Sequence, residues 1–81
     1  MKAHVYVTLK TSDLDPQGQT IHNALGKIGF AAVTDVRQGK YFALSLAGGL
    51  TAEAAKSMVE RIAREVLTNP VIEEYTYRIE E

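Results

Sequence analysis

The stretch TAEAAKSMVERIAREVLTNPVIEEYTYRI, residues 51–79, contains the two periodicities that decide the fold of this chain. Up to Val66 the apolar residues recur at helical spacing, and from Tyr75 onward apolar and polar residues alternate. Asn69-Pro70 separates the two patterns, because the residue before a proline is pushed out of the helical region. The sequence therefore predicts a helix that ends before Asn69 and a strand over residues 71–79.

This predicted helix is the clearest element of the chain. Thr51 is its expected N-cap, and Glu53 lies in the first turn, where the helix dipole favours a negative charge. Glu60 and Arg64 are spaced to form a supporting i,i+4 ion pair on the solvent side. The face expected to point inward is apolar and consists of Ala55, Met58, Val59, Ile62, Ala63 and Val66.

The N-terminal third of the chain predicts a strand followed by a helix. Apolar residues alternate with polar ones from Ala3 to Lys10, which indicates a strand with one face in the core. Asp15-Pro16 is typical of a helix start, with Asp15 as N-cap and Pro16 at the first helical position. Gly29 suits the left-handed C-terminal cap, and Phe30 should fold back onto the last turn. The apolar stripe of this helix consists of Ile21, Ala24, Leu25 and Ile28.

Residues 33–46 are strand-like but interrupted. Phe42, Leu44 and Leu46 share a face, yet Lys40 would fall on the same face if the strand ran on unbroken. Gly39 is the natural place for a bulge or tight turn that resets the alternation. The segment is therefore either two short strands or one long bent strand.

The order of elements predicts one domain over residues 1–81, a two-layer α+β sandwich of the β-α-β(-β)-α-β type. Its sheet should be mainly antiparallel, with both helices on one face, as in ferredoxin-like folds. The other face is half apolar and too small for a third layer, so a second copy is its simplest cover and we expect a dimer. The residues expected on that face are Tyr6, Thr8, Ile72 and Thr76.

Composition excludes several classes of site. There is no cysteine, and two histidines are too few for a typical metal site. The formal net charge of −1 provides no broad positive field for a nucleic acid. No apolar run approaches the roughly 18 residues of a membrane span, and residues 1–5 lack the apolar core of a signal peptide. We expect a cytoplasmic protein with no nucleic-acid or membrane partner.

No catalytic group stands out among the polar residues. His22 has no identifiable nucleophile or acid partner, and His4 fits the dimer face better than a catalytic role. Asp15 beside Asp13 is explained as a helix cap rather than as an acid–base pair. The segment 37–40, RQGK, either binds an anion or acidic partner, or protects an edge strand from pairing. We therefore predict no catalytic residue, no metal ligand and no cofactor bound by this chain.

The sequence resembles the PurS family, the small subunit of phosphoribosylformylglycinamidine (FGAM) synthase, over nearly its whole length. The motifs that carry the resemblance are VTLK (7–10), DPQG (15–18), AL (24–25), IGF (28–30), Val33, VR (36–37), GK (39–40), LTNPVIE (67–73) and Tyr75. The positions carried over as structural or partner-contact residues are Asp15, Gly18, Arg37, Gly39, Lys40, Asn69, Pro70 and Glu73.

The resemblance implies a function that residue patterns alone do not. Such subunits form dimers and join a large synthetase subunit to a glutaminase subunit. The complex uses ATP, Mg and glutamine to convert formylglycinamide ribonucleotide to the formylglycinamidine. The small subunit supports complex formation and ammonia transfer and has no catalytic residue in the family pattern.

Two other classes share this order of elements. One is a small-molecule-binding regulatory module of the ACT-like kind, which tight binding of an amino acid or nucleotide would reveal. The other is an enzyme of the acylphosphatase kind, which needs an anion-binding loop with arginine near the first strand. Residues 11–13, TSD, contain no arginine, which disfavours that enzyme.

Overall fold

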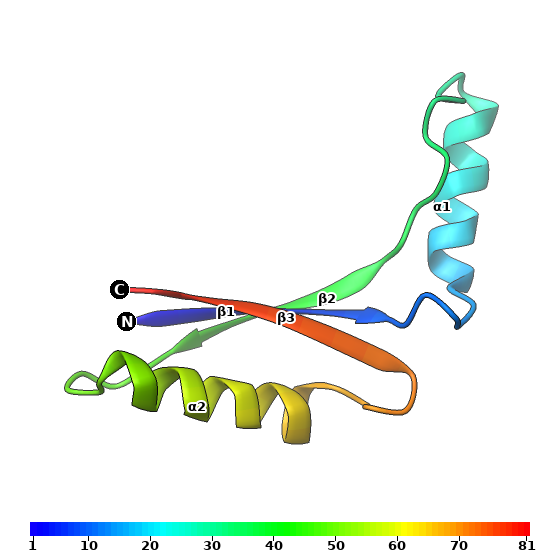
Figure 1. The fold of residues 1–81 in the computed structure, drawn as a ribbon. Coiled ribbons are helices and arrows are strands. Elements are labelled where there is room, and N and C mark those ends of the chain that lie inside the picture. The colour runs from blue at the N-terminus through cyan, green and yellow to red at the C-terminus, as the bar shows by residue number, and fades with distance from the viewer.

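The computed structural model describes all of residues 1–81 and contains one sheet and two helices (Figure 1). The strands are β1 (Lys2–Leu9), β2 (Gly39–Ser45) and β3 (Glu73–Glu80), and both of their pairings are antiparallel in the order β2-β1-β3. The helices are α1 (Pro16–Lys27) and α2 (Ala52–Ile62), and a π-helical turn η1 (Ala63–Leu67) continues α2. The predicted α+β class with an antiparallel sheet is confirmed.

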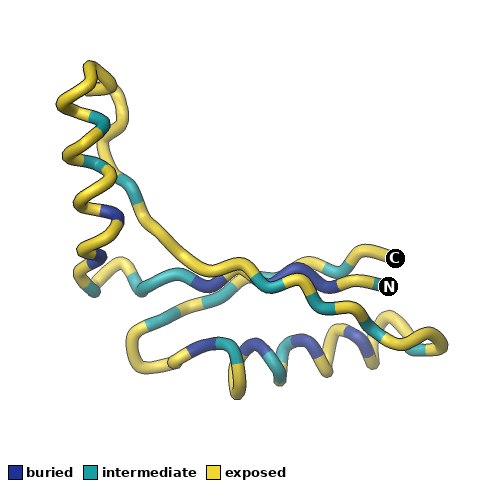
Figure 2. The backbone as a smooth tube through the Cα atoms, turned by 180° about the vertical axis from the view of Figure 1, so that it is seen from behind, coloured by how far each residue is buried: buried dark blue, intermediate teal, exposed yellow.

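The core lies between β1 and α2. The alternation of β1 buries Ala3, Val5 and Val7, and α2 with η1 covers them with Val59 and Ala63. Figure 2 shows this buried strip along the central strand and the inner side of α2, whereas most of the remaining backbone is exposed. Only 10 of 81 residues are buried, so the core is thin, as expected for a chain of this size.

The position of α1 is the main correction to the predicted architecture. Both helices were expected on one face of the sheet, but only α2 packs there, and α1 stands away from one end of the sheet (Figure 1). The segments that lead into and out of α1 are hydrogen-bonded to each other and direct the helix away from the sheet. We call residues 11–38 the arm.

Local signals place the ends of α1 correctly. The Asp15 carboxylate accepts a hydrogen bond from the Gly18 N–H at 3.0 Å, with Pro16 in the first turn. Gly29 has a φ of +99°, in the left-handed region that glycine favours, and the Phe30 N–H donates to the Leu25 carbonyl. The Phe30 side chain nevertheless stays largely exposed, because nothing covers this tip of the arm.

The end of α2 differs from the predicted pattern. Thr51 caps the helix as expected, but the wider π turn of η1 follows Ile62 and leaves Val66 74% exposed rather than inward. Glu60 does not pair with Arg64, because its carboxylate accepts a hydrogen bond from the Tyr77 hydroxyl at 2.6 Å. The i,i+4 ion pair of this helix is instead Arg61–Glu65, at 2.9 Å.

The interrupted segment forms a single strand. β2 begins at Gly39, which is paired with Thr8 in a regular register, and the preceding residues of the arm are not in a strand. The predicted bulge or tight turn at Gly39 is therefore absent. Gly39 is the first residue of β2, so no strand residues precede it whose alternation would need to be reset.

The molecule is elongated. Its extents are 51 × 26 × 14 Å and its radius of gyration is 16.1 Å, against about 12 Å for a compact domain of this length. The two termini lie side by side at the end of the sheet away from the arm, where Lys2 is paired with Glu80 (Figure 1). Neither helix is long and apolar enough to cross a lipid bilayer.

Candidate functional site

The Asp15 carboxylate connects the two segments at the base of the arm. One oxygen accepts the Gly18 N–H, and the other accepts the Gln38 N–H at 2.8 Å. These hydrogen bonds, first that from Gly18 and then that from Gln38, lower the pKa of Asp15 below its ordinary value. The residue is buried, and both oxygens already have partners, so Asp15 is a cap rather than a free acid or metal ligand.

Two glycines allow main chains to approach each other closely at the same place. A Cβ on Gly18 would lie 2.3 Å from the Val36 carbonyl oxygen, and one on Gly39 would lie 2.3 Å from the Val7 carbonyl oxygen. Both distances are shorter than any real Cβ contact, and both neighbours are backbone atoms that cannot rotate away. The glycines at these positions are therefore required for close packing and not for a phosphate-binding loop.

The Arg37 guanidinium binds main-chain oxygens from the start of the arm. Its Nη2 lies 3.2, 2.9 and 3.3 Å from the carbonyl oxygens of Leu9, Lys10 and Asp13. A guanidinium suits this role because it is always charged and each terminal nitrogen carries more than one N–H donor. Arg37 thus fixes the direction in which the chain leaves β1.

The turn that precedes β3 completes the group. The Asn69 side chain accepts the Val71 N–H at 3.2 Å, and the Asn69 N–H donates to the Glu73 carboxylate at 2.8 Å. Glu73 also forms an ion pair with Lys40 on β2 at 3.4 Å. The Pro70 carbonyl accepts a hydrogen bond from Lys10 Nζ at 2.8 Å.

All eight positions carried over from the family pattern therefore lie at one end of the sheet. We call these residues (Asp15, Gly18, Arg37, Gly39, Lys40, Asn69, Pro70 and Glu73) the junction. Four of them line a cleft of about 280 Å³, namely Asp15, Gly39, Lys40 and Glu73, and the rest of its lining consists of Val7, Thr8, Leu9, Gln17 and Gln38. The acidic and basic side chains of the junction bind each other or the main chain, which is the chemistry of a structural link.

Lys10 contacts the junction, although the sequence did not predict it as a contact residue. Its main-chain N–H donates to the Ile72 carbonyl at 2.8 Å, and its side chain reaches Pro70. A lysine at the end of a strand carries no local sign of such a contact, because the partner lies far along the chain.

The other predicted residues lie on the side of the sheet opposite α2, which we call the open face. Tyr6 is paired with Thr76 in the sheet, and Thr8 follows on the same face. Ile72, just before β3, is 39% exposed. Tyr6 also stacks on Tyr41, with ring centroids 5.4 Å apart.

His4 is the centre of a polar network on the open face that the sequence did not predict. Its Nδ1 lies 2.6 Å from the Tyr41 hydroxyl and its Nε2 lies 3.2 Å from a Glu80 carboxylate oxygen. With the proton on Nε2, the ring donates to Glu80 and accepts from Tyr41. The contact with His4 lowers the pKa of Glu80.

The remaining candidates are separate from the junction. His22 binds the Val33 carbonyl within the arm at 3.0 Å, and the Asp13 carbonyl, not its side chain, contacts Arg37. No three acidic or histidine side chains are close enough together to hold a metal ion.

The fold and the junction define a class of protein: a small α+β domain whose charged junction side chains bind main-chain groups or one another and have a structural role. Comparison with known proteins makes the assignment specific. The family model PurS, described as phosphoribosylformylglycinamidine (FGAM) synthase, matches residues 2–81. The chain belongs to the PurS family.

Individual relatives agree with the family match. The FGAM synthase subunit PurS of Bacillus subtilis is 40% identical over 80 residues, which cover 99% of this chain and 93% of the relative. The crystal structure of Methanocaldococcus jannaschii PurS has a TM-score of 0.85 at 35% identity and covers 99% of this chain and 95% of its own. A chain in the structure of PurLQS from Thermotoga maritima has a TM-score of 0.81 at 31% identity and covers 95% and 93%. The regulatory-module alternative gains no support from these matches.

Proposed function

We propose that this chain is the PurS subunit of FGAM synthase in purine biosynthesis, where it supports assembly of the synthetase and glutaminase subunits and ammonia transfer between them. The observation that carries the proposal is the family match over residues 2–81 together with the similarity to a chain of a PurLQS complex. The complex uses ATP, Mg and glutamine, and its chemistry takes place on the other subunits. The site of action is the cytoplasm.

The residue chemistry agrees with a non-catalytic role. The Asp15, Arg37 and Glu73 side chains are engaged with main-chain groups or with each other. A group already held by the protein's own backbone is poorly suited to move a proton or bind a substrate. The junction instead fixes the direction of the arm and the shape of the surface that partner subunits would contact.

We also propose that the chain self-associates, as a dimer or a higher oligomer, through the open face. Tyr6 and Ile72 supply partly exposed apolar area there, Thr76 is paired with Tyr6, and Thr8 follows Tyr6 on the same face of β1. Closed twofold pairing is the commonest way to cover such a face. A Thr76→Arg substitution should weaken association measured by light scattering, whereas Ala47→Arg on an exposed loop should not.

The functional test is reconstitution of FGAM synthase with and without this chain. Omitting it should greatly reduce glutamine-dependent formation of the amidine and reduce ammonia-dependent formation much less. Supplying ammonia directly bypasses the need to pass it from the glutaminase to the synthetase. Equal glutamine-dependent activity in both mixtures would refute the proposed role.

A further inference from the structure

A histidine on the central strand is buried within the open face. His4 and Asp15 are the two titratable residues that the fold buries, at 8% and 7% exposed. Asp15 is a helix cap with both carboxylate oxygens occupied, whereas His4 lies outside the junction. Histidine is the side chain that ordinarily changes its charge between pH 5 and 8. The neighbours of His4 therefore decide what a change of pH does to the open face.

Side chains from both flanking strands occupy the two ring nitrogens of His4. Nδ1 lies 2.6 Å from the Tyr41 hydroxyl on β2, and Nε2 lies 3.2 Å from a Glu80 carboxylate oxygen on β3. In the neutral ring with its proton on Nε2, Nδ1 accepts the hydrogen of the Tyr41 hydroxyl. A second proton turns Nδ1 into a donor, so Tyr41 must then accept the hydrogen bond and direct its own hydrogen away from the ring.

The Tyr41 ring extends this contact to the surface of the open face. It is stacked on the His4 ring, with centroids 5.8 Å apart and planes 8° apart, and its other neighbour is the Tyr6 ring. Tyr41 is 54% exposed and Tyr6 is 40% exposed. Tyrosine is enriched among the residues that dominate interface energies. The buried histidine thus directly contacts the aromatic part of the face that we propose to self-associate.

The charged groups around His4 come from β1 and β3, and Tyr41 is the titratable neighbour on β2. Arg78, which is paired with His4 in the sheet, lies 3.6 Å from Glu80, and Lys2 precedes His4 on the same side of β1. The contact with His4, followed by the charges of Arg78 and Lys2, lowers the pKa of Glu80, which favours its ionised form. The cluster of Lys2, His4, Arg78 and Glu80 carries a net charge of +1 with neutral His4 and +2 with protonated His4.

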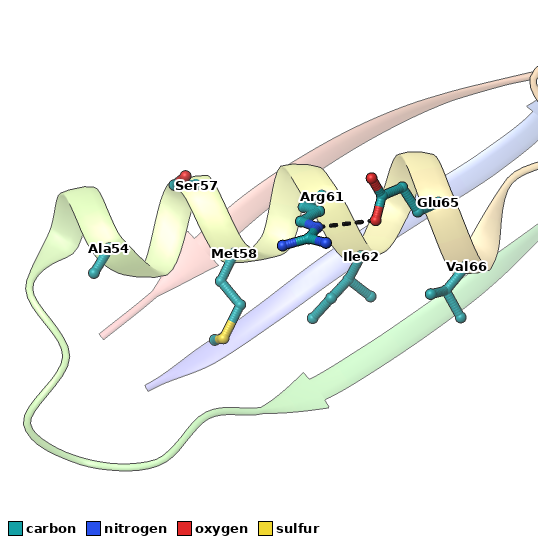
Figure 3. Close-up of a pocket in the computed structure, with 7 residues that line it drawn as sticks. All are labelled: Ala54, Ser57, Met58, Arg61, Ile62, Glu65 and Val66. Atoms are coloured by element: carbon teal, nitrogen blue, oxygen red, sulfur yellow. Dashed lines mark hydrogen bonds and ion pairs between the residues drawn. The ribbon is translucent and has the colours of Figure 1, made fainter.

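The helix side of the sheet provides a comparison because it carries no histidine. Figure 3 shows the side chains of Met58 and Ile62 pointing to one side of α2, with Arg61 and Glu65 above them. Arginine and glutamate side chains ordinarily keep their charges between pH 5 and 8. The second histidine of the chain, His22, lies in the arm. A response to pH in this range therefore points to one of two histidines, which substitution can distinguish.

We infer that His4 is a pH-sensitive switch in the open face, and that protonation of its ring weakens the association of two copies through this face. Closed twofold pairing brings the same surface of both copies together, so protonation adds two positive charges to one interface. Like charges that face each other across an interface cost binding free energy. The inference rests on the proposed self-association and adds its regulation.

The dissociation constant at pH 7.5 and pH 5.5 tests the switch. At constant ionic strength we expect the value for the parent chain to rise about tenfold or more on acidification. His22→Gln is the control and should show the same rise. His4→Gln, whose amide stays neutral, should change by less than about twofold. Analytical ultracentrifugation measures the dissociation constant, and circular dichroism confirms that each variant retains its helices and strands.

A second measurement follows the switch in the dissociated chain and does not require a substitution at His4. The His22→Gln variant has a single histidine, so its imidazole signals in the NMR spectrum belong to His4. Between pH 7.5 and 5.5 the Tyr41 ring signals should move with the same midpoint as those of His4, because the two side chains are hydrogen-bonded. The ring signals of Tyr75, which packs against the core, should not follow this midpoint.

Each contrary result has a definite meaning. Equal dissociation constants at the two pH values would overturn the inference, and so would a rise that persists in His4→Gln. Tyr41 ring signals that do not follow the His4 midpoint would also overturn it. A chain that stays monomeric at both pH values would remove the open-face association and the inference together. None of these results bears on the proposed role in FGAM synthase, which reconstitution tests, and a failure there would leave the pH response in place.

Discussion

At the scale of single residues, Gly18 and Gly26 provide a matched pair in one helix. A Cβ at Gly18 would overlap the Val36 carbonyl oxygen, whereas a Cβ at Gly26 would meet nothing within 4 Å. Gly18→Ala should therefore reduce the free energy of unfolding by about 1–3 kcal/mol, the usual cost of overpacking. Gly26→Ala should raise it by up to about 1 kcal/mol through helix propensity.

Urea denaturation of the two variants and the parent chain measures both changes. If Gly18→Ala is as stable as the parent, the return segment of the arm does not lie against the first turn of α1 as described.

Asp15 makes stability depend on pH in a defined direction. Its pKa is lowered in the folded chain by the Gly18 and Gln38 hydrogen bonds, so the folded state favours the ionised form. This contribution is fully present above the unfolded pKa of about 4 and is lost as the pH falls through the lower folded value. Asp15→Asn should be less stable at neutral pH and should lose less stability on acidification.

The pH dependence of the denaturation midpoint from pH 7 to pH 2 tests this expectation. Asp13→Asn is the control, because its side chain makes no hydrogen bond in the structure, and its profile should follow that of the parent. Parallel profiles for Asp15→Asn and the parent would contradict the assigned role.

At the scale of elements, a side-chain hydrogen bond links α2 to β3. The Tyr77 hydroxyl donates to Glu60, and this hydrogen bond raises the pKa of Tyr77 to about 12. The stabilising contribution is therefore complete below the unfolded pKa of about 10 and disappears as the pH rises through about 12. Tyr77→Phe should loosen α2 on the sheet at neutral pH and remove this loss of stability in alkali.

Absorbance of the phenolate during alkaline titration measures the ionisation. We expect one of the four tyrosines to titrate near 12 and this step to be missing in Tyr77→Phe. Tyr75→Phe should retain the late step. A late step that persists in Tyr77→Phe would show that another tyrosine is responsible.

The elements themselves could be predicted wherever the deciding residues are close together in the sequence. Asp15-Pro16 marked the start of α1, Gly29 its end, and Asn69-Pro70 the change from helix to strand. Each of these signals acts within one turn of backbone. The regular entry of Gly39 into β2 and the π turn after Ile62 depend on packing, and neither could be predicted from local spacing.

The sequence suggested candidate site residues but not their arrangement, and their role as structural or partner-contact positions stays a prediction. The resemblance to a family identified eight residues that do come together, although composition gave no reason to place Arg37 on the carbonyl of Lys10. The contacts that Lys10 and His4 make within the chain were missed because their partners, Pro70 and Glu80, are distant along the chain.

At the scale of the whole molecule, elongation and a thin core imply stability that depends on association. A partner that binds only the folded chain adds stability by mass action. The thermal midpoint should therefore rise as the chain concentration increases from about 1 to 100 μM, and differential scanning fluorimetry over that range measures it. A midpoint that stays constant would mean that the isolated chain is folded without help.

The placement of α1 could not be predicted, because it depends on contacts of the whole molecule and not on local sequence. An apolar stripe on a helix favours packing against other apolar residues, but it does not identify the surface that would provide them. Sequence periodicity assigned the stripe to the chain's own sheet, and the structure directs α1 away from that sheet.

The adjacent termini have a consequence for protein engineering. Because Lys2 and Glu80 are partners on neighbouring antiparallel strands, a short glycine linker from Glu81 to Met1 would turn β3 and β1 into a hairpin. New ends opened between Gly48 and Gly49, in an exposed loop with free space around both residues, would yield a circular permutant. In that permutant the central strand and its neighbour would become consecutive in sequence, which shortens the loop that folding must close and should speed up the formation of the sheet.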